Sequence, residues 1–360
     1  MAGDRGETAG VSGPPGASLA SASLASASLA STSLASPSLA DASLASASPP
    51  DASLASASPP DASLASASLS LRLTRFRMRW VARPILARAK NVGVLRLMAS
   101  MGAWFAFPPR DMVLSPWGEG GLELRPTKAR TGPLVVWFHG GGYVACSPHT
   151  HRSMLIQIAR ASDLRLIAPA YRLAPEHPGG AAFADALRAC QAILASGIPS
   201  GALILAGDSA GGGLAAAVTA ALCGLGQPPG GLLALSPWTD MTGSGASHRE
   251  NADRDVLLPP ERLADLVGLV RGDLPPEDPR LSPAFASFPG LPRAYLSVGT
   301  DEILRDDTRL LAARLAEGGT EVTAHELHGA LHVLAFQAPR VPEARAEIAR
   351  IAAWLQGIPL

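Results

Sequence analysis

The chain of 360 residues is long enough for one large domain with additional material, or for two modest domains. It carries 30 basic and 30 acidic residues, so its overall charge points to neither nucleic acid nor an anionic membrane as a partner. The three cysteines lie far apart without metal-ligand spacing. No apolar run of about 18 residues predicts a transmembrane helix, which argues against stable membrane insertion. The polar start of the chain lacks the features of a signal peptide and predicts a cytoplasmic protein.

Residues 17–70 form a low-complexity tract in which the unit Ser-Leu-Ala-Ser-Ala recurs. Its leucines stand five residues apart, a period that matches neither an amphipathic helix nor a half-buried strand. One leucine in five residues cannot bury enough apolar surface to offset the entropy of ordering the chain. A pentapeptide-repeat solenoid is disfavoured by the pairs Pro49–Pro50 and Pro59–Pro60. We therefore predict that residues 1–70 are a disordered tail, and the sequence leaves its function open.

Residues 71–130 are expected to form N-terminal cap helices and a lead-in to the main domain. Leu71 to Met101 mixes arginines with large apolar residues and is interrupted by Pro84, which predicts two short amphipathic helices. A basic amphipathic helix can bind membranes or acidic partners. The interpretation that we favour is a helix pair that covers the core with solvated arginines outside. Trp80 and the aromatic residues at 104, 105 and 107 are candidates for packing within this cap or lining a pocket under it.

From residue 131 to 360 apolar strands and helices alternate, which is typical of a parallel sheet covered on both faces. The expected strands are Leu134–Phe138, Arg165–Pro169, Ala202–Ala206, Leu232–Leu235, Ala294–Val298 and Val322–Leu327. The expected helices are His151–Ser162, Phe183–Ala195, Leu214–Leu222, Asp306–Glu317 and Pro342–Leu355. Residues 243–280 interrupt the alternation with polar, proline-rich sequence and one helix, Glu261–Val270. We expect a lid or cap insertion there.

The sequence Gly207-Asp208-Ser209-Ala210-Gly211 joins an apolar strand to an alanine-rich helix. This is the strand–turn–helix context of a nucleophile elbow, in which a serine is held at a strained turn between small residues. Ser209 would lie at the N-terminus of a helix, whose dipole favours developing negative charge. We predict that Ser209 is a catalytic nucleophile. A plain glycine-rich turn is the alternative.

A second glycine-rich segment, His139-Gly140-Gly141-Gly142, follows the first strand of the alternating region. Such a loop leaves backbone N–H groups free to bind the oxyanion that forms during acyl transfer. We predict an oxyanion hole made of the N–H groups of Gly141, Gly142 and Ala210.

The remaining catalytic groups are expected at the carboxyl ends of the last two strands. Four acids follow Ala294–Val298, namely Asp301, Glu302, Asp306 and Asp307. Asp301 is our choice for the catalytic acid because it stands at the junction of strand and loop. Of His328 and His332, we choose His332 as the base because it lies further into the loop. The chain order Ser209, Asp301, His332 is that of the α/β-hydrolase triad.

With these motifs, residues 78–355 resemble the hormone-sensitive-lipase-like esterases and lipases of the α/β-hydrolase fold. The resemblance rests on the motifs named above together with the blocks Tyr171–Pro178 and Ser236–Asp240. It implies a mostly parallel sheet with helices on both faces and a helical cap built from the N-terminal segment and the insertion. It also implies that Tyr171–Pro178 forms a structural corner, and that Glu176 and Asp208 belong to a hydrogen-bonding scaffold.

The function expected from the sequence is that of a serine carboxylesterase with no metal and no organic cofactor. The family resemblance implies short- to medium-chain acyl esters or lactones as small-molecule substrates. Two alternatives remain. One is a deacetylase of an N- or O-acetylated small molecule with the same triad. The other is a small-molecule receptor on the same fold, which the presence of His332 disfavours because such receptors have lost the triad histidine. The sequence leaves open whether the protein is a homodimer.

Overall fold

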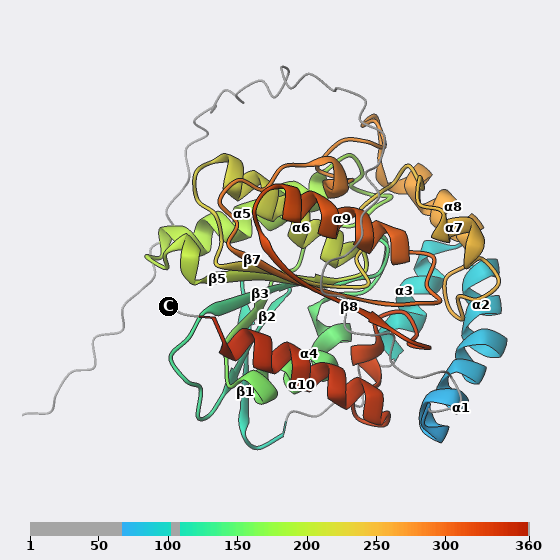
Figure 1. The fold of residues 1–360 in the computed structure, drawn as a ribbon, viewed down its shortest axis with the longest axis horizontal. Coiled ribbons are helices and arrows are strands. Elements are labelled where there is room, and N and C mark those ends of the chain that lie inside the picture. Colours follow the sequence, from blue (N-terminus) through green and yellow to red (C-terminus); the bar gives the residue numbers. More distant parts are fainter. Residues whose placement is uncertain (1–66, 102–108, 359–360) are drawn as a thin grey trace, which may run out of the picture. The chain divides into compact units, whose positions relative to one another are not determined.

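The computed structural model describes residues 67–101 and 109–358. The predicted tail lies outside these residues apart from its last four positions, and so do the aromatic residues at 104, 105 and 107. The expected fold class is confirmed: an eight-stranded, mostly parallel sheet lies between two layers of helices (Figure 1).

The strand order in the sheet is β1-β2-β4-β3-β5-β6-β7-β8. From β4 to β8 every neighbouring pair is parallel, whereas β1 and β2 run antiparallel to their neighbours. The strands are β1 (Met112–Trp117), β2 (Gly121–Pro126), β3 (Leu134–Phe138), β4 (Leu166–Ala168), β5 (Leu203–Asp208), β6 (Gly231–Leu235), β7 (Arg293–Gly299) and β8 (Glu321–Leu327).

Helices cover both faces of the sheet. In Figure 1, α5 (Ala181–Ala195), α6 (Ala210–Gly224) and α9 (Arg305–Glu317) lie on one side, and α4 (Pro148–Ser162) and α10 (Pro342–Gln356) on the other. The central strand β5 is buried along its whole length. Its side chains alternate between the two apolar clusters, because successive residues of a strand point to opposite faces. A continuous apolar run is therefore needed in this strand.

Within the lead-in that is expected before residue 131, β1 and β2 form an antiparallel hairpin. The sequence of β2 has the alternation typical of a strand, because Leu122 and Leu124 are buried and alternate with Glu123 and Arg125. Trp117 pairs with Gly121 across the turn. The hairpin extends the sheet beyond the parallel strands, which begin only at β3.

The N-terminal helices depart from the expectation that Pro84 separates them. Helix α1 (Leu69–Arg77) continues through a π-helical turn (Met78–Ala82) into α2 (Arg83–Arg88), and Pro84 lies in the first turn of α2. The π-helical turn ends two residues before the proline and includes Trp80, the residue whose carbonyl would clash with the proline ring in a regular helix. The break lies instead between residues 88 and 92, before α3 (Val92–Met101). Among the helices that the structure describes, none combines the length and apolarity needed to cross a bilayer.

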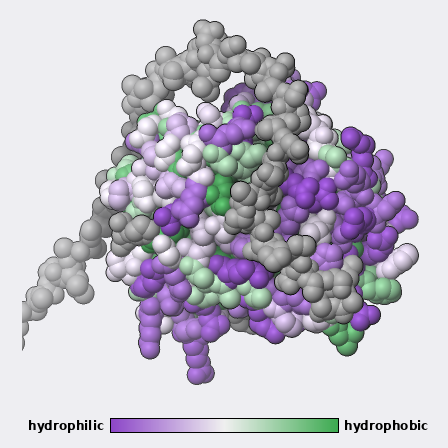
Figure 2. Space-filling view, in the orientation of Figure 1, coloured by the Kyte–Doolittle hydropathy of each residue, from purple (hydrophilic) through white to green (hydrophobic). Residues whose placement is uncertain are grey.

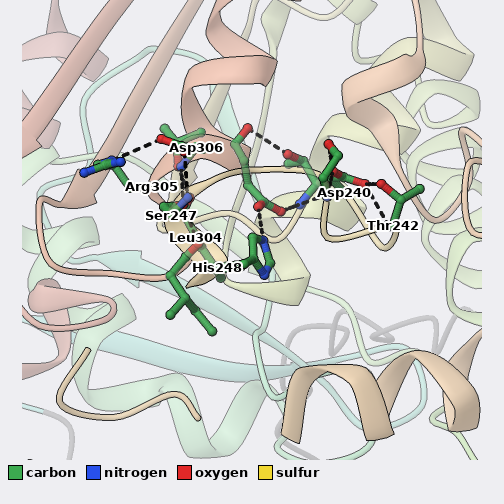
Figure 3. A network of polar contacts seen from close by, with 12 residues as sticks. Asp240, Thr242, Ser247, His248, Leu304, Arg305 and Asp306 are labelled. Carbon is green, nitrogen blue, oxygen red and sulfur yellow. Dashed lines mark hydrogen bonds and ion pairs between the residues drawn. The ribbon is translucent and has the colours of Figure 1, made fainter. Parts of the chain in front are cut away.

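The insertion contains α7 (Ser247–Glu250) and α8 (Pro260–Val270) and is fastened to the first turn of α9. His248 Nε2 lies 2.7 Å from Asp307 Oδ1, and the backbone N–H of Ser247 donates to Asp306 at 2.8 Å (Figure 3). The other oxygen of Asp307 accepts from the N–H groups of Thr239 and Asp240. Burial alone would lower the pKa of His248, but the Asp307 carboxylate raises it above its usual value. Asp306 and Asp307 thus have structural partners.

Packing between α6 and the loop after β6 is testable at Gly213. A Cβ at this position would lie 2.0 Å from the Trp238 carbonyl oxygen, whereas one at Gly224 in the same helix would meet nothing within 4 Å. We expect Gly213→Ala to destabilise the protein by about 2 kcal/mol or more. The control Gly224→Ala should stay within about 1 kcal/mol of the parent, on the stabilising side. Urea unfolding measures both, and equal stability of the two variants would contradict this packing.

Candidate active site

Ser209 occupies the sharp turn between β5 and α6. Its φ of 54° and ψ of −126° lie outside the regions that residues other than glycine usually adopt. The turn closes tightly, because a Cβ on Gly207 would lie 2.2 Å from the Gly211 carbonyl oxygen. The Ser209 N–H donates to the Leu235 carbonyl at 2.8 Å, which fixes the elbow against β6. The structure therefore holds Ser209 in the strained conformation of a nucleophile elbow.

The loop after β3 lies against this elbow. A Cβ on Gly140 would fall 2.9 Å from the Asp208 carbonyl oxygen and 3.1 Å from the Ser209 Cβ, so a side chain there would push the loop away from the elbow. Gly141 and Gly142 have φ values of 116° and 63°, which glycine adopts readily. The N–H groups of Gly141, Gly142 and Ala210 donate to no acceptor within the described part of the chain. They are thus available to an external oxyanion.

The block Tyr171–Pro178 packs against the glycine-rich loop and supports it by hydrogen bonds. The Tyr171 ring stacks on His139 with centroids 4.2 Å apart, and its hydroxyl donates to the His139 carbonyl. The N–H of Ala174 donates to the Tyr143 carbonyl at 2.9 Å. Glu176 forms an ion pair with Arg96 of α3 at 2.7 Å. The corner implied by the family resemblance is present, and Glu176 belongs to its scaffold.

Asp208, the residue before Ser209, is buried next to the rings of Trp137 and His151. It accepts a hydrogen bond from the Trp137 indole at 2.9 Å and lies 3.1 Å from His151 Nε2. Burial favours the protonated acid, but His151 and the indole outweigh it and hold the pKa of Asp208 below its ordinary value. Asp208 is a charged support beneath the elbow.

His332 follows β8 and pairs with Glu302. Its Nδ1 lies 2.7 Å from Glu302 Oε2, and both side chains are almost fully buried. Burial by itself lowers the pKa of His332, but the Glu302 carboxylate, helped by Asp255 and Asp208, raises it above the usual value. A carboxylate at Nδ1 fixes the tautomer in which Nε2 is free to accept a proton. His328, the alternative, immediately follows the end of β8.

The structure corrects the choice of Asp301 as the acid that orients His332. Asp301 lies in the turn after β7 and forms ion pairs with Arg75 at 2.9 Å and Arg254 at 2.7 Å. The Asp301 carboxylate is thus paired with one arginine of the N-terminal helix and one of the insertion. The adjacent residue, Glu302, supplies the carboxylate at His332. The rule of taking the first acid after the strand fails here because neighbouring residues of a turn point in different directions.

Residues that sequence reasoning missed hold Glu302 in place. Its Oε1 accepts hydrogen bonds from the Ser236 hydroxyl at 2.8 Å and from the Gly299 N–H at 2.6 Å. Ser236 also accepts from the N–H of Val333, next to His332. Since Ser236 follows Leu235, to which Ser209 is bonded, this serine links the elbow to the Glu302–His332 pair. Only its place in the block Ser236–Asp240 could have indicated it.

The insertion fixes the backbone on either side of Glu302. The Asn251 side-chain amide donates to the Glu302 carbonyl at 2.8 Å, and Asp255 accepts from the Ile303 N–H at 3.0 Å. Helix α8 reaches the other side of the site, where a Cβ on Gly142 would lie 2.9 Å from Leu266 Cδ1. The insertion therefore contacts both the backbone around Glu302 and the glycine-rich loop.

The arrangement brings a strained serine, an oriented histidine and free N–H donors to the carboxyl edge of the sheet. Comparison with known proteins agrees with this chemistry. The model of the α/β-hydrolase fold family Abhydrolase_3 matches residues 135–336. An acetyl-hydrolase of Streptomyces hygroscopicus is 36% identical over 251 residues, covering 69% of this chain and 83% of the relative. An esterase of Acinetobacter venetianus is 33% identical, covering 68% and 80%.

Solved structures give the same result. A bacterial esterase of the hormone-sensitive lipase family superimposes with a TM-score of 0.75 at 33% identity, covering 81% of this chain and 98% of that one. The esterase EstE5, in a crystal soaked with p-nitrophenyl butyrate, gives a TM-score of 0.75 at 31% identity, with the same coverage. The chain belongs to the α/β-hydrolase fold family, among the hormone-sensitive-lipase-like esterases.

The Glu302–His332 pair can be tested without any substrate. Because the Glu302 carboxylate raises the pKa of His332, Glu302→Gln should lower that pKa. Asp301→Asn should leave it unchanged, since Asp301 faces Arg75 and Arg254. Titration of the imidazole signals by NMR measures both variants. A fall with Asp301→Asn and none with Glu302→Gln would restore Asp301 as the partner of His332.

Proposed function

We propose that this protein is a serine carboxylesterase in which Ser209, His332 and Glu302 form the catalytic triad. The observation that carries the proposal is the Glu302–His332 hydrogen bond, at the same edge of the sheet as the strained Ser209 turn. The names of the relatives support ester hydrolysis as the reaction class.

In the proposed mechanism, Ser209 Oγ attacks the ester carbonyl carbon while His332 Nε2 accepts its proton. Glu302 stabilises the resulting imidazolium, and it does so within a site that excludes most water. The negative oxygen of the tetrahedral intermediate is bound by the N–H groups of Gly141, Gly142 and Ala210. A single donor of this kind contributes about 3 kcal/mol to transition-state stabilisation.

The imidazolium then gives its proton to the leaving alcohol, and the acyl group remains on Ser209. Water attacks this acyl-enzyme as His332 takes up one of its protons, and the second tetrahedral intermediate uses the same oxyanion hole. Collapse releases the carboxylic acid and returns the proton to Ser209. No step requires a metal or an organic cofactor.

We propose short- to medium-chain acyl esters or lactones as substrates. The insertion supports this size limit, because Leu266 of α8 packs against Gly142 in the glycine-rich loop. The EstE5 crystal was soaked with p-nitrophenyl butyrate, an ester with a four-carbon acyl group. A deacetylase of an acetylated small molecule is the second candidate, which the name of the Streptomyces relative favours.

Hydrolysis of p-nitrophenyl esters from acetate to dodecanoate tests the proposal. We expect activity to peak at short chains and kcat to fall by a factor on the order of 10⁴ or more in Ser209→Ala. Glu302→Gln should cost a factor of about 10² to 10⁴, because His332 loses its orientation and its counter-charge.

Asp301→Asn serves as the matched control and should remain within about tenfold of the parent, since its carboxylate does not touch His332. A larger loss in Asp301→Asn than in Glu302→Gln would contradict the proposed triad. Inactivity on every ester together with activity on an acetylated amine would favour the deacetylase.

A further inference from the structure

The N-terminal helix turns its apolar side away from the protein. Residues 69–88 form one continuous helix through α1, the π-helical turn and α2. Leu69, Leu73, Phe76 and Trp80 recur at the spacing of a single helical face and are 69%, 55%, 61% and 64% exposed. The rings of Phe76 and Trp80 lie 6.4 Å apart and extend this apolar stripe. A helix whose only role was to cover the core would point such a stripe inward.

The opposite side of the same helix is fastened to the protein by polar contacts. Arg75 donates to the Gly329 carbonyl at 2.7 Å in addition to its ion pair with Asp301. The remaining contacts are Ser68 to Glu343, Arg79 to the Asp253 carbonyl and Arg83 to the Ala252 carbonyl. These bonds fix the direction in which the apolar stripe faces.

The surroundings of the stripe are strongly basic. Residues 67–101 contain no aspartate or glutamate and carry the cations Arg72, Arg75, Arg77, Arg79, Arg83, Arg88, Lys90 and Arg96. Arg72 and Arg77 flank the stripe on its two sides and are exposed. Hydrophilic and apolar residues lie next to one another at the lower right of Figure 2, where Figure 1 places α1. This excess of positive charge is local, because the whole chain is neutral.

We propose that the outer face of residues 69–88 docks on an anionic lipid surface. Leucine, phenylalanine and tryptophan on one face, with arginines beside them, match a helix that lies in the plane of a membrane interface. The aromatic pair would enter the boundary between headgroups and acyl chains, where tryptophan is favoured. The flanking guanidinium groups would bind lipid phosphates.

Other occupants fit this face less well. A second copy of the chain related by a two-fold axis would bring the arginines of one helix against those of the other. The tail before residue 67 offers few negative charges, namely Asp4, Glu7, Asp41, Asp51 and Asp61. The face is the convex outside of a helix, whereas an acidic peptide would need a groove to bury its side chains.

Co-sedimentation of the full chain with vesicles tests the proposal. The probes are vesicles of phosphatidylcholine alone and of phosphatidylcholine mixed with phosphatidylglycerol. We expect binding to the anionic vesicles that weakens with added salt. The double variants Phe76→Ser/Trp80→Ser and Arg72→Glu/Arg77→Glu should each weaken binding by about tenfold or more.

Matched controls are Leu225→Ser, an exposed leucine at the end of α6, and the charge reversal Arg340→Glu/Arg345→Glu. Both should bind within about twofold of the parent. Unchanged hydrolysis of a soluble ester by Phe76→Ser/Trp80→Ser would show that this variant is folded. Failure of the parent to bind anionic vesicles would overturn the proposal, as would equal losses in the controls. So would an oligomer that the Phe76→Ser/Trp80→Ser variant converts to a monomer, because the face would then be an interface between copies.

Discussion

The turn between β7 and α9 organises the candidate site, because its adjacent carboxylates Asp301 and Glu302 point in different directions and bind different partners. Glu302 points inward to His332 and is held by Ser236 and the Gly299 N–H. Asp301 is bound by arginines of the N-terminal helix and the insertion. Glu302 thus serves the proposed chemistry, while Asp301 binds the N-terminal helix and the insertion to the same turn. Because Asp301 and Glu302 are neighbours in the chain, a movement of the N-terminal helix or of the insertion would shift the backbone that carries Glu302.

Much of the fold can be predicted from the sequence because the signals are local. Buried parallel strands require continuous apolar runs, and β3, β5 and β6 show them. The elbow and the glycine-rich loop require small residues at fixed positions, since a Cβ on Gly207 or Gly140 would clash with nearby atoms. Such patterns identify Ser209, Gly141 and Gly142 as candidates from the amino-acid sequence alone.

The features that cannot be predicted depend on contacts between distant residues. Nothing near Asp301 in the sequence shows that Arg75 and Arg254 will form ion pairs with it, so its position after the strand favours an acid that does not contact His332. The roles of Asn251 and Asp255 likewise come from the folded insertion. Pro84 is expected to end a helix, but a π-helical turn accommodates it. The spacing of apolar residues predicts that α1 has an apolar face, but it does not show whether this face points toward the core or toward solvent.

Covalent labelling tests whether Ser209 is the activated nucleophile of this protein. A fluorophosphonate that mimics the tetrahedral intermediate should modify the full chain once, and peptide mapping by mass spectrometry should place the adduct on Ser209. The label requires a serine activated by His332 and an oxyanion hole ready to bind the phosphonyl oxygen. We expect one adduct at Ser209 and none in Ser209→Ala. A folded protein that gives no adduct, or gives one on another residue, would contradict this expectation.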